Sequence, residues 1–159
     1  MPSPDEPAAG ELPDLTGWLR GSGDVVVSPA RRAHVDGGTV DERVRPWDLG
    51  RWTGRALADL PPEELAAWRS DPAWAGHGGE SLEQLHHRVA AVLDAWRDGP
   101  PRRAVVTHGG VVRAAVVLTL RAPTDAAWDV DVRPGSRTEL SATARGWRVQ
   151  SVGCGAGPA

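Results

Sequence analysis

The stretch that decides the fold is "RAVVTHGGVVRAAVVLTL", residues 103–120. Its short apolar start predicts a buried strand over 103–107. Residues 109–120 are apolar on nearly all sides, which predicts a helix buried between layers. His108 stands between the two elements and is followed by two glycines. The free backbone N–H groups at the start of such a helix, together with its dipole, favour an anion beside the imidazole.

A second predicted strand ends in residues of similar chemistry. The stretch "DVVVSPARR", residues 24–32, is a compact valine strand closed by Ser28 and a proline. In open α/β sheets, ligands bind beyond the carboxyl ends of the strands. The guanidinium of Arg32 and the imidazole of His108 would suit a phosphoryl group there, with the backbone N–H of Gly109 as a further donor. We therefore predict one anion pocket at these two strand ends.

The remaining periodicities predict a layered α/β domain. In residues 81–99, apolar residues recur every three or four positions, Ser81 and Gln84 form a capping box, and a glycine ends the helix. Further helices are predicted within 13–21 and from 61 to 68, and further strands at 128–132, 137–142 and 146–152. This order predicts a three-layer α/β/α sandwich whose sheet is mostly parallel with an antiparallel edge. We expect one domain over residues 1–152 and a flexible tail over 153–159.

Composition argues against several classes of partner. The 159-residue chain has a formal net charge of −3, so no broad basic field predicts binding to nucleic acid or to an anionic membrane. No signal peptide and no apolar run of about 18 residues is recognisable, so we predict a cytoplasmic protein. All 18 basic residues are arginine, and Lys, Asn, Ile, Phe and Tyr are missing, which is typical of a GC-rich genome.

No cofactor or metal site is predicted. Cys154 is the only cysteine, so paired thiolate ligands and a disulfide framework are excluded. His77, His86 and His87 are the one histidine cluster in the sequence. Adjacent histidines on a helix point about 100° apart and do not easily face one ion. We therefore expect neither a metal nor another cofactor. The oligomeric state is not predicted.

The chain resembles the histidine phosphatase superfamily, the phosphoglycerate-mutase-like proteins. Four segments are similar to the family's motifs and follow the family's order: "SPARRA" at 28–33, "DLGRWTGRAL" at 48–57, "GHGGESLEQLHHRV" at 76–89 and "VVTHGGVVRAAV" at 105–116. The resemblance implies a phosphoglycerate-mutase-like fold. It also implies a metal-independent phosphatase acting on a small phosphorylated metabolite. Arg32 resembles the family's phosphate-binding arginine, and His108 resembles its second pocket histidine.

One motif of the family is missing from this sequence. The resemblance implies that the nucleophilic histidine, together with a second arginine, belongs to an Arg-His-Gly element at the end of the first strand. The sequence contains no Arg-His-Gly, and "SPDEP" at 3–7 resembles a loop that follows that element in some members. We therefore expect the first strand to be missing, through a start codon assigned too late or through loss. The first explanation is favoured because a lost central strand leaves backbone groups unpaired.

The motifs offer two candidates for the acid that protonates the leaving group. The family commonly places a glutamate four residues before the glycine that Gly50 resembles, and here that position is Pro46. Asp48 and Glu80 are the candidates to protonate the leaving group, and either would need a raised pKa to do so near neutral pH. The alternatives are that Asp48 is a turn residue and that Glu80 caps a helix.

The residues predicted to lie over the pocket and the overall activity of the chain each have more than one interpretation. Trp68, Trp74 and His77 are candidates for an apolar substrate lid, while the tryptophans are equally explained as core residues that replace Phe and Tyr. Without its nucleophile, the chain itself is expected to be weakly active or inactive as a phosphatase. A pseudoenzyme that binds a phosphorylated ligand or a protein partner is one alternative. A mutase is another, although it would call for more basic residues at the pocket than the sequence offers.

Overall fold

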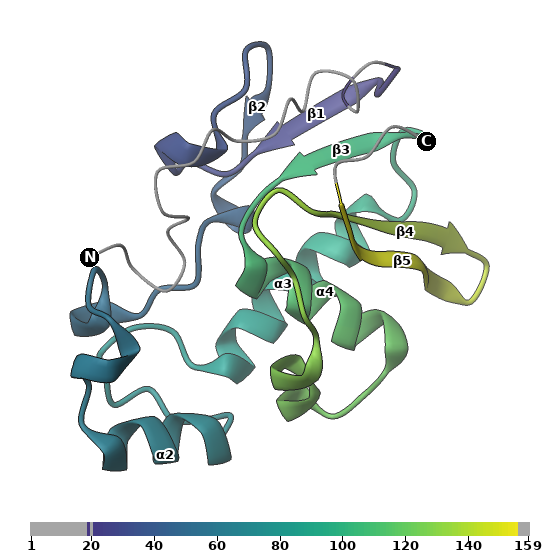
Figure 1. Cartoon of the computed structure of the whole chain (residues 1–159). Helices are drawn as coiled ribbons and strands as arrows, with labels where there is room; N and C mark the ends of the chain where they lie inside the picture. The colour runs from purple at the N-terminus through teal and green to yellow at the C-terminus, as the bar shows by residue number, and fades with distance from the viewer. Residues whose placement is uncertain (1–18, 20, 156–159) are drawn as a thin grey trace.

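The computed structural model describes residue 19 and residues 21–155. A parallel three-stranded sheet is formed by β1 (Asp24–Val27), β2 (Thr39–Val40) and β3 (Arg103–Val106), in the order β2-β1-β3. A separate antiparallel pair contains β4 (Arg137–Thr143) and β5 (Gly146–Cys154). The predicted mixed α/β fold with an antiparallel edge is therefore confirmed (Figure 1).

Two details of the strands differ from the sequence prediction. Residues 128–132 form no strand: the short helix η5 (Thr124–Asp129) includes the first two of them, and Trp128 packs against the core cluster. β5 continues through Gly153 and Cys154, which were assigned to the flexible tail. Cys154 stays in the strand because it pairs with Arg137, and the N–H of Gly153 donates to Thr138 Oγ1. The rest of the predicted tail, from 156, and the helix predicted within 13–21, apart from Leu19 and Gly21, lie outside the described residues.

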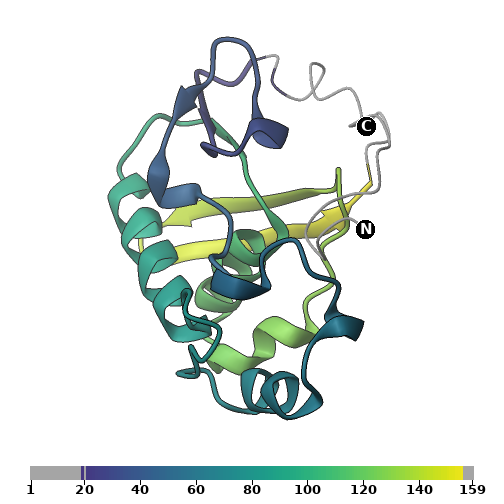
Figure 2. The ribbon, with the colours of Figure 1, turned by 90° about the vertical axis from the view of Figure 1, so that its left-hand side faces the viewer.

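The main helices follow their sequence signals closely. α3 (Leu82–Trp96) begins at the predicted capping box: Ser81 Oγ accepts from the N–H of Gln84, and the Gln84 side chain accepts from the N–H of Ser81. α4 (Gly109–Leu120) spans the predicted residues, and α2 (Pro62–Ser70) begins at its two prolines. In the view of Figure 1, α3 and α4 lie below the three-stranded sheet, and in Figures 1 and 2 α2 lies at the end of the molecule opposite β1 and β2. Among the described residues, no helix is long and apolar enough to cross a membrane.

Tryptophan side chains form the centre of the largest core cluster. Trp47, Trp52, Trp68 and Trp128 stack in tilted and edge-on pairs whose ring centroids lie 4.5–5.8 Å apart. Aliphatic residues of α3 and α4 pack around them. Aromatic pairs of this kind add roughly 0.5–1.5 kcal/mol each beyond their buried area. The indoles thus supply the core volume that Phe and Tyr supply in most proteins.

Two loops cross with their backbones in direct contact beneath this core. The N–H of Glu80 donates to the carbonyl of Asp48 at 2.7 Å, and the N–H of Arg51 donates to the carbonyl of His77 at 3.0 Å. A Cβ placed on Gly79 would overlap the Asp48 carbonyl and would lie 2.5 Å from the Gly50 nitrogen. The crossing therefore requires glycine at position 79.

An ion pair joins the same loop to α3. Glu80 Oε1 accepts from Arg88 Nε at 2.8 Å, and Glu80 Oε2 accepts from Arg88 Nη2 at 2.7 Å. The side chains are only 8% and 10% exposed. Arg88 Nη1 also donates to the carbonyls of Arg43 and Arg45. Glu80 and Arg88 therefore link three chain segments, and neither charge is left unpaired.

Replacing Gly79 with alanine is expected to destabilise the protein by more than about 2 kcal/mol, because backbone atoms of the crossing loop have to move. Gly23→Ala is the matched control, since its Cβ would meet nothing closer than 4.0 Å. Urea unfolding followed by tryptophan fluorescence measures both variants. Equal stability of the two would show that the crossing loops are not held at this position.

Replacing Glu80 with alanine is expected to cost about 3–5 kcal/mol, because it leaves the Arg88 guanidinium buried without its carboxylate. Glu83 is exposed on the same helix, and Glu83→Ala is expected to change the unfolding free energy by less than about 0.5 kcal/mol. Chemical denaturation of both variants decides the point. A loss below about 1 kcal/mol for Glu80→Ala would contradict the structural role of this pair.

Candidate functional site

The two predicted strand ends meet at one edge of the sheet. β1 and β3 are parallel neighbours in a register that pairs Val27 with Val106, and the N–H of Ser28 donates to the Val106 carbonyl at 2.9 Å. The residues that follow the two strands, Ser28 and Thr107, therefore leave the sheet side by side. The short helix η1 (Arg31–Ala33) then places Arg32 next to His108.

Arg32, His108 and Ser28 form a hydrogen-bonded cluster. Arg32 Nε donates to His108 Nδ1 at 3.1 Å, and His108 Nε2 lies 2.8 Å from Ser28 Oγ. Because Nδ1 accepts from an arginine, the single proton of the neutral imidazole is on Nε2, which donates to the serine oxygen. His108 is 7% exposed and Ser28 is 2% exposed, so the imidazole is held in one orientation and one tautomer.

The electrostatics of the cluster keep His108 neutral. Burial, and after it the nearby positive charge of Arg32, lower the pKa of His108 to about 4. At neutral pH, the positive charge at this place therefore belongs to Arg32. A bound anion would favour the protonated imidazolium, so this histidine is able to gain a charge when an anion arrives.

A cavity of about 500 Å³ opens beside the cluster. Arg32, Thr107, His108 and Gly109 contribute to its wall. His108 is the residue that caps α4, and its side chain makes no capping hydrogen bond, so it leaves the N–H groups of the first helical turn to other partners. A guanidinium, an imidazole and a helix N-terminus around one cavity are the groups that bind a phosphoryl oxygen.

The two candidate proton donors lie elsewhere. Asp48 is exposed, and its Oδ1 accepts from the N–H of Gly50 at 2.9 Å, which is an ordinary turn contact. Both carboxyl oxygens of Glu80 accept from Arg88, which directs the group toward α3. Neither side chain lines the cavity beside His108. The contact of Asp48 is that of a turn residue, whereas Glu80 does not cap α3, because Ser81 is the capping residue and the Glu80 side chain binds Arg88.

The three candidate lid residues belong to the core region instead. Trp68 is 8% exposed within the tryptophan cluster, and His77 is 1% exposed between Trp52 and Trp74. Burial lowers the pKa of His77, whose Nδ1 accepts from the N–H of Gly79. None of the three lines the cavity beside His108. The apolar lid therefore finds no support in their contacts.

Sequence reasoning missed the direct contact of Ser28 with the imidazole. It named Ser28 as a strand end but gave no role to its hydroxyl. The strand register could have revealed this contact. If β1 and β3 are parallel neighbours, the residue after β1 must lie beside the residues that follow β3. Which two strands are neighbours was not readable from the pattern alone.

No second histidine shares the cavity with His108. The chain has five histidines, all within the described residues. His34 is exposed beside Asp36, and His77 lies among the tryptophans. His86 is buried on α3 against the Leu82 carbonyl, and its neighbour on the helix, His87, is exposed.

Proteins of known activity match part of this chain. Glucosyl-3-phosphoglycerate phosphatase of Mycolicibacterium vanbaalenii is 34% identical over 99 residues, which are 55% of this chain and 44% of that protein. The Mycobacterium tuberculosis protein of the same name is 36% identical over 97 residues, or 53% and 44% of the two chains. The aligned region thus spans less than half the length of these relatives.

Solved structures match over most of the chain. Mycobacterial glucosyl-3-phosphoglycerate phosphatase in complex with inorganic phosphate superposes with a TM-score of 0.75 at 25% identity, covering 91% of this chain and 82% of that chain. A structure described as mycobacterial hydrolase 2 superposes with a TM-score of 0.73 at 27% identity, covering 88% and 74%. The family model of the histidine phosphatase superfamily (branch 1) matches residues 24–155. With this match over most of its length, the chain belongs to the histidine phosphatase superfamily.

Proposed function

We propose that this chain forms the phosphate-binding half of a metal-independent phosphatase for small phosphomonoesters. The main support for the proposal is the contact of Arg32 Nε with His108 Nδ1 at the N-terminus of α4. These two side chains and the helix N-terminus supply donors from different directions around one cavity. A phosphoryl group that gains negative charge on its oxygens during transfer is stabilised by such donors.

The chemistry we propose proceeds through a phosphohistidine. A histidine nitrogen attacks phosphorus, the ester P–O bond breaks, and the leaving oxygen takes a proton from an acid. Water then attacks the phosphohistidine and releases phosphate, and the histidine is free again. Arg32 and His108 hold the phosphoryl oxygens through both steps. We assign no residue as this acid, because neither Asp48 nor Glu80 lies at the cavity beside His108.

The attacking histidine is proposed to come from outside these 159 residues. His108 is the one histidine at the cavity, and its Nδ1 and Nε2 are both engaged, with Arg32 and Ser28. The chain as it stands is therefore expected to bind phosphate without turning over a phosphomonoester. A protein that binds a phosphorylated ligand without hydrolysis is the second candidate function, and the same observation favours it.

The substrate class follows from the relatives. Both mycobacterial relatives are glucosyl-3-phosphoglycerate phosphatases. Glucosyl-3-phosphoglycerate is therefore the first substrate to test on a form of the protein that includes the attacking histidine. Nothing in the contacts at the cavity of this chain selects that leaving group over another.

Arg32→Ala is expected to weaken the binding of inorganic phosphate by about 10- to 100-fold, because it removes charge-assisted hydrogen bonds to the anion. Arg31 is exposed, adjacent and equally charged, so Arg31→Ala is the matched control and should change the affinity by less than about twofold. Isothermal titration calorimetry measures both. Equal losses would mean that phosphate binding depends on general positive charge rather than on a specific site.

The unmodified 159-residue chain should hydrolyse p-nitrophenyl phosphate no faster than its His108→Ala variant. Robust turnover that is lost in His108→Ala would overturn the proposal that the nucleophile lies outside this chain.

Phosphate is expected to raise the pKa of His108 from about 4 by more than about one unit, because the anion favours the imidazolium. By linkage, one proton is taken up on binding when the pH lies between the free and bound pKa values. Histidine ring NMR shifts, recorded against pH with and without phosphate, measure the change. His87 is exposed on α3 and serves as the internal control, whose ring shifts should be the same with and without phosphate. An unchanged His108 titration at saturating phosphate would place the anion elsewhere.

A further inference from the structure

The hydroxyl of Ser28 lies at the junction of the two chain segments that carry Arg32 and His108. Ser28 is 2% exposed and directly follows β1, and its Oγ lies 2.8 Å from His108 Nε2. The N–H of Ala30 also donates to this oxygen, at the longer distance of 3.4 Å. Pro29 has no N–H, so Ala30 is the first residue after Ser28 that can close such a turn. The Ser28 oxygen is therefore in contact with both segments of the site.

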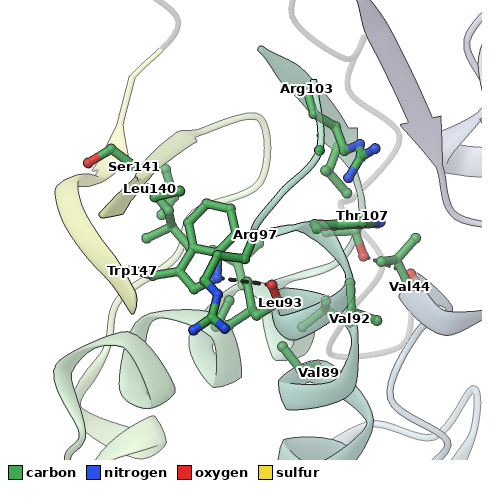
Figure 3. A pocket seen from close by; sticks show the side chains of 18 of the residues that line it. Val44, Val89, Val92, Leu93, Arg97, Arg103, Thr107, Leu140, Ser141 and Trp147 are labelled. Carbon is green, nitrogen blue, oxygen red and sulfur yellow. Dashed lines mark hydrogen bonds between the residues drawn. The ribbon is translucent and has the colours of Figure 1, made fainter. Parts of the chain in front are cut away.

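The backbones on the two sides of this hydroxyl are fixed by hydrogen bonds. The N–H of Ser28 donates to the Val106 carbonyl at 2.9 Å. One residue before His108, Thr107 Oγ1 donates to the Val44 carbonyl at 2.8 Å (Figure 3). The ends of β1 and β3 are thus held in place, and the positions of protons are what can change between Ser28 and the imidazole.

The donors around His108 place the ring proton on Nε2 in the free protein. Arg32 Nε can only donate, so His108 Nδ1 accepts and carries no proton. The Ser28 oxygen then accepts from Nε2, and among the described residues the hydroxyl proton of Ser28 has no acceptor of its own. A hydroxyl group donates as well as accepts, and it turns to suit its partner. The Ser28 proton is therefore available for a second arrangement.

A phosphoryl group reverses what Nδ1 has to do. Its oxygens accept hydrogen bonds, so an anion bound between Arg32 and His108 needs a proton on Nδ1. The imidazolium supplies this proton at a pH below the pKa of the bound state. The neutral tautomer with its proton on Nδ1 supplies it as well, and in that tautomer Nε2 becomes an acceptor. The Ser28 hydroxyl can then donate to Nε2 across the same 2.8 Å contact.

We propose that Ser28 is a positioning residue that lets the neutral imidazole of His108 donate from Nδ1 to a bound phosphoryl group. This proposal rests on the anion site proposed above and defines how that site works at a pH where the imidazolium does not form. The ring holds one proton before and after binding, because Nδ1 takes a proton from water and Nε2 releases one to water. Ser28 keeps its own proton and turns it toward Nε2.

The surroundings of His108 favour a neutral donor over a charged one. Burial, and after it the positive charge of Arg32, lower the pKa of the imidazole. The other charged residues that line the cavity in the described chain are Arg102, Arg103, Arg137 and Glu139. Three of these four are arginines, so the wall as a whole disfavours a further positive charge on the ring. A change of tautomer supplies the donor without adding that charge.

The first test uses the unmodified 159-residue protein with inorganic phosphate. Nitrogen NMR of the histidine rings distinguishes a ring nitrogen that carries a proton from one that does not. The pH is set about two units above the pKa that His108 shows with phosphate bound, so that little imidazolium remains. The ring proton should be mainly on Nε2 without phosphate and mainly on Nδ1 at saturation. A proton that stays on Nε2 while phosphate is bound would overturn the proposal.

Variants at position 28 assign the effect to the hydroxyl. At the same pH, Ser28→Ala should bind phosphate at least about tenfold more weakly and should not show the transfer of the proton to Nδ1, because Nε2 would be left buried without a donor. Ser28→Thr keeps the hydroxyl and should bind within about threefold of the unmodified protein. If Ser28→Ala does not fold, the measurement on the unmodified protein decides alone.

Ser81→Ala is the matched control for a lost buried hydroxyl. Ser81 is 3% exposed, and its Oγ accepts from the N–H of Gln84 at the start of α3. Ser81 does not line the cavity beside His108. The variant should lose stability through the missing cap but should change the phosphate affinity by less than about twofold. An equal loss of affinity in Ser28→Ala and Ser81→Ala would assign the effect to general destabilisation and overturn the proposal.

The outcomes separate the role of Ser28 from the anion site itself. Phosphate binding that is weakened in Arg32→Ala but unchanged in Ser28→Ala would sustain the anion site and overturn the role of Ser28. Absence of phosphate binding to the unmodified protein would overturn the anion site and, with it, this proposal. Binding that needs both Arg32 and the Ser28 hydroxyl, with the proton on Nδ1, is the result expected.

Discussion

The parallel pairing of β1 with β3 is the constraint on which the site depends. Its register sets Val27 opposite Val106, so the two chain segments leave the sheet together. Ser28 and Arg32 come from one segment and His108 from the other, 76 residues further along than Arg32. A slip of one residue would turn the side chains to the opposite faces of the sheet and separate the three polar groups. The apolar valines of both strands hold this register, so core packing and site geometry have the same origin.

The cluster is organised around a buried histidine that stays neutral. Burial disfavours the imidazolium, and Arg32 adds a like charge beside it. This arrangement has a consequence for stability: the neutral form is favoured fully above the unfolded pKa of about 6.5, and the benefit is lost as the pH falls through about 4. It also has a consequence for binding. An anion that replaces the contact between Arg32 and His108 accepts from Arg32 Nε and, once the imidazole carries a proton on Nδ1, from His108 Nδ1, so the free state holds both groups close to where the anion needs them.

Local signals predicted the parts of the fold that local chemistry controls. The capping box at Ser81 and the apolar run before Leu120 gave two helices with the observed starts. The two-residue strand β2 was hidden in a polar turn, because it forms only through pairing with β1. The segment at 128–132 alternates like a strand, yet Trp128 stacks on the core at the end of the short helix η5 and the three residues after Asp129 pair with none of the described strands. Tertiary packing overrode the local pattern in both cases.

The predicted site residues show the same difference between what the local sequence indicates and what tertiary packing decides. Arg32 and His108 were predictable because each lies a few residues beyond the end of an apolar strand, Arg32 after β1 and His108 after β3, and the structure brings them into contact. Asp48 and Glu80 were named as the acidic residues nearest to the motif positions, and nearness in sequence carries no information on distance to His108; their partners are a turn N–H and a buried arginine.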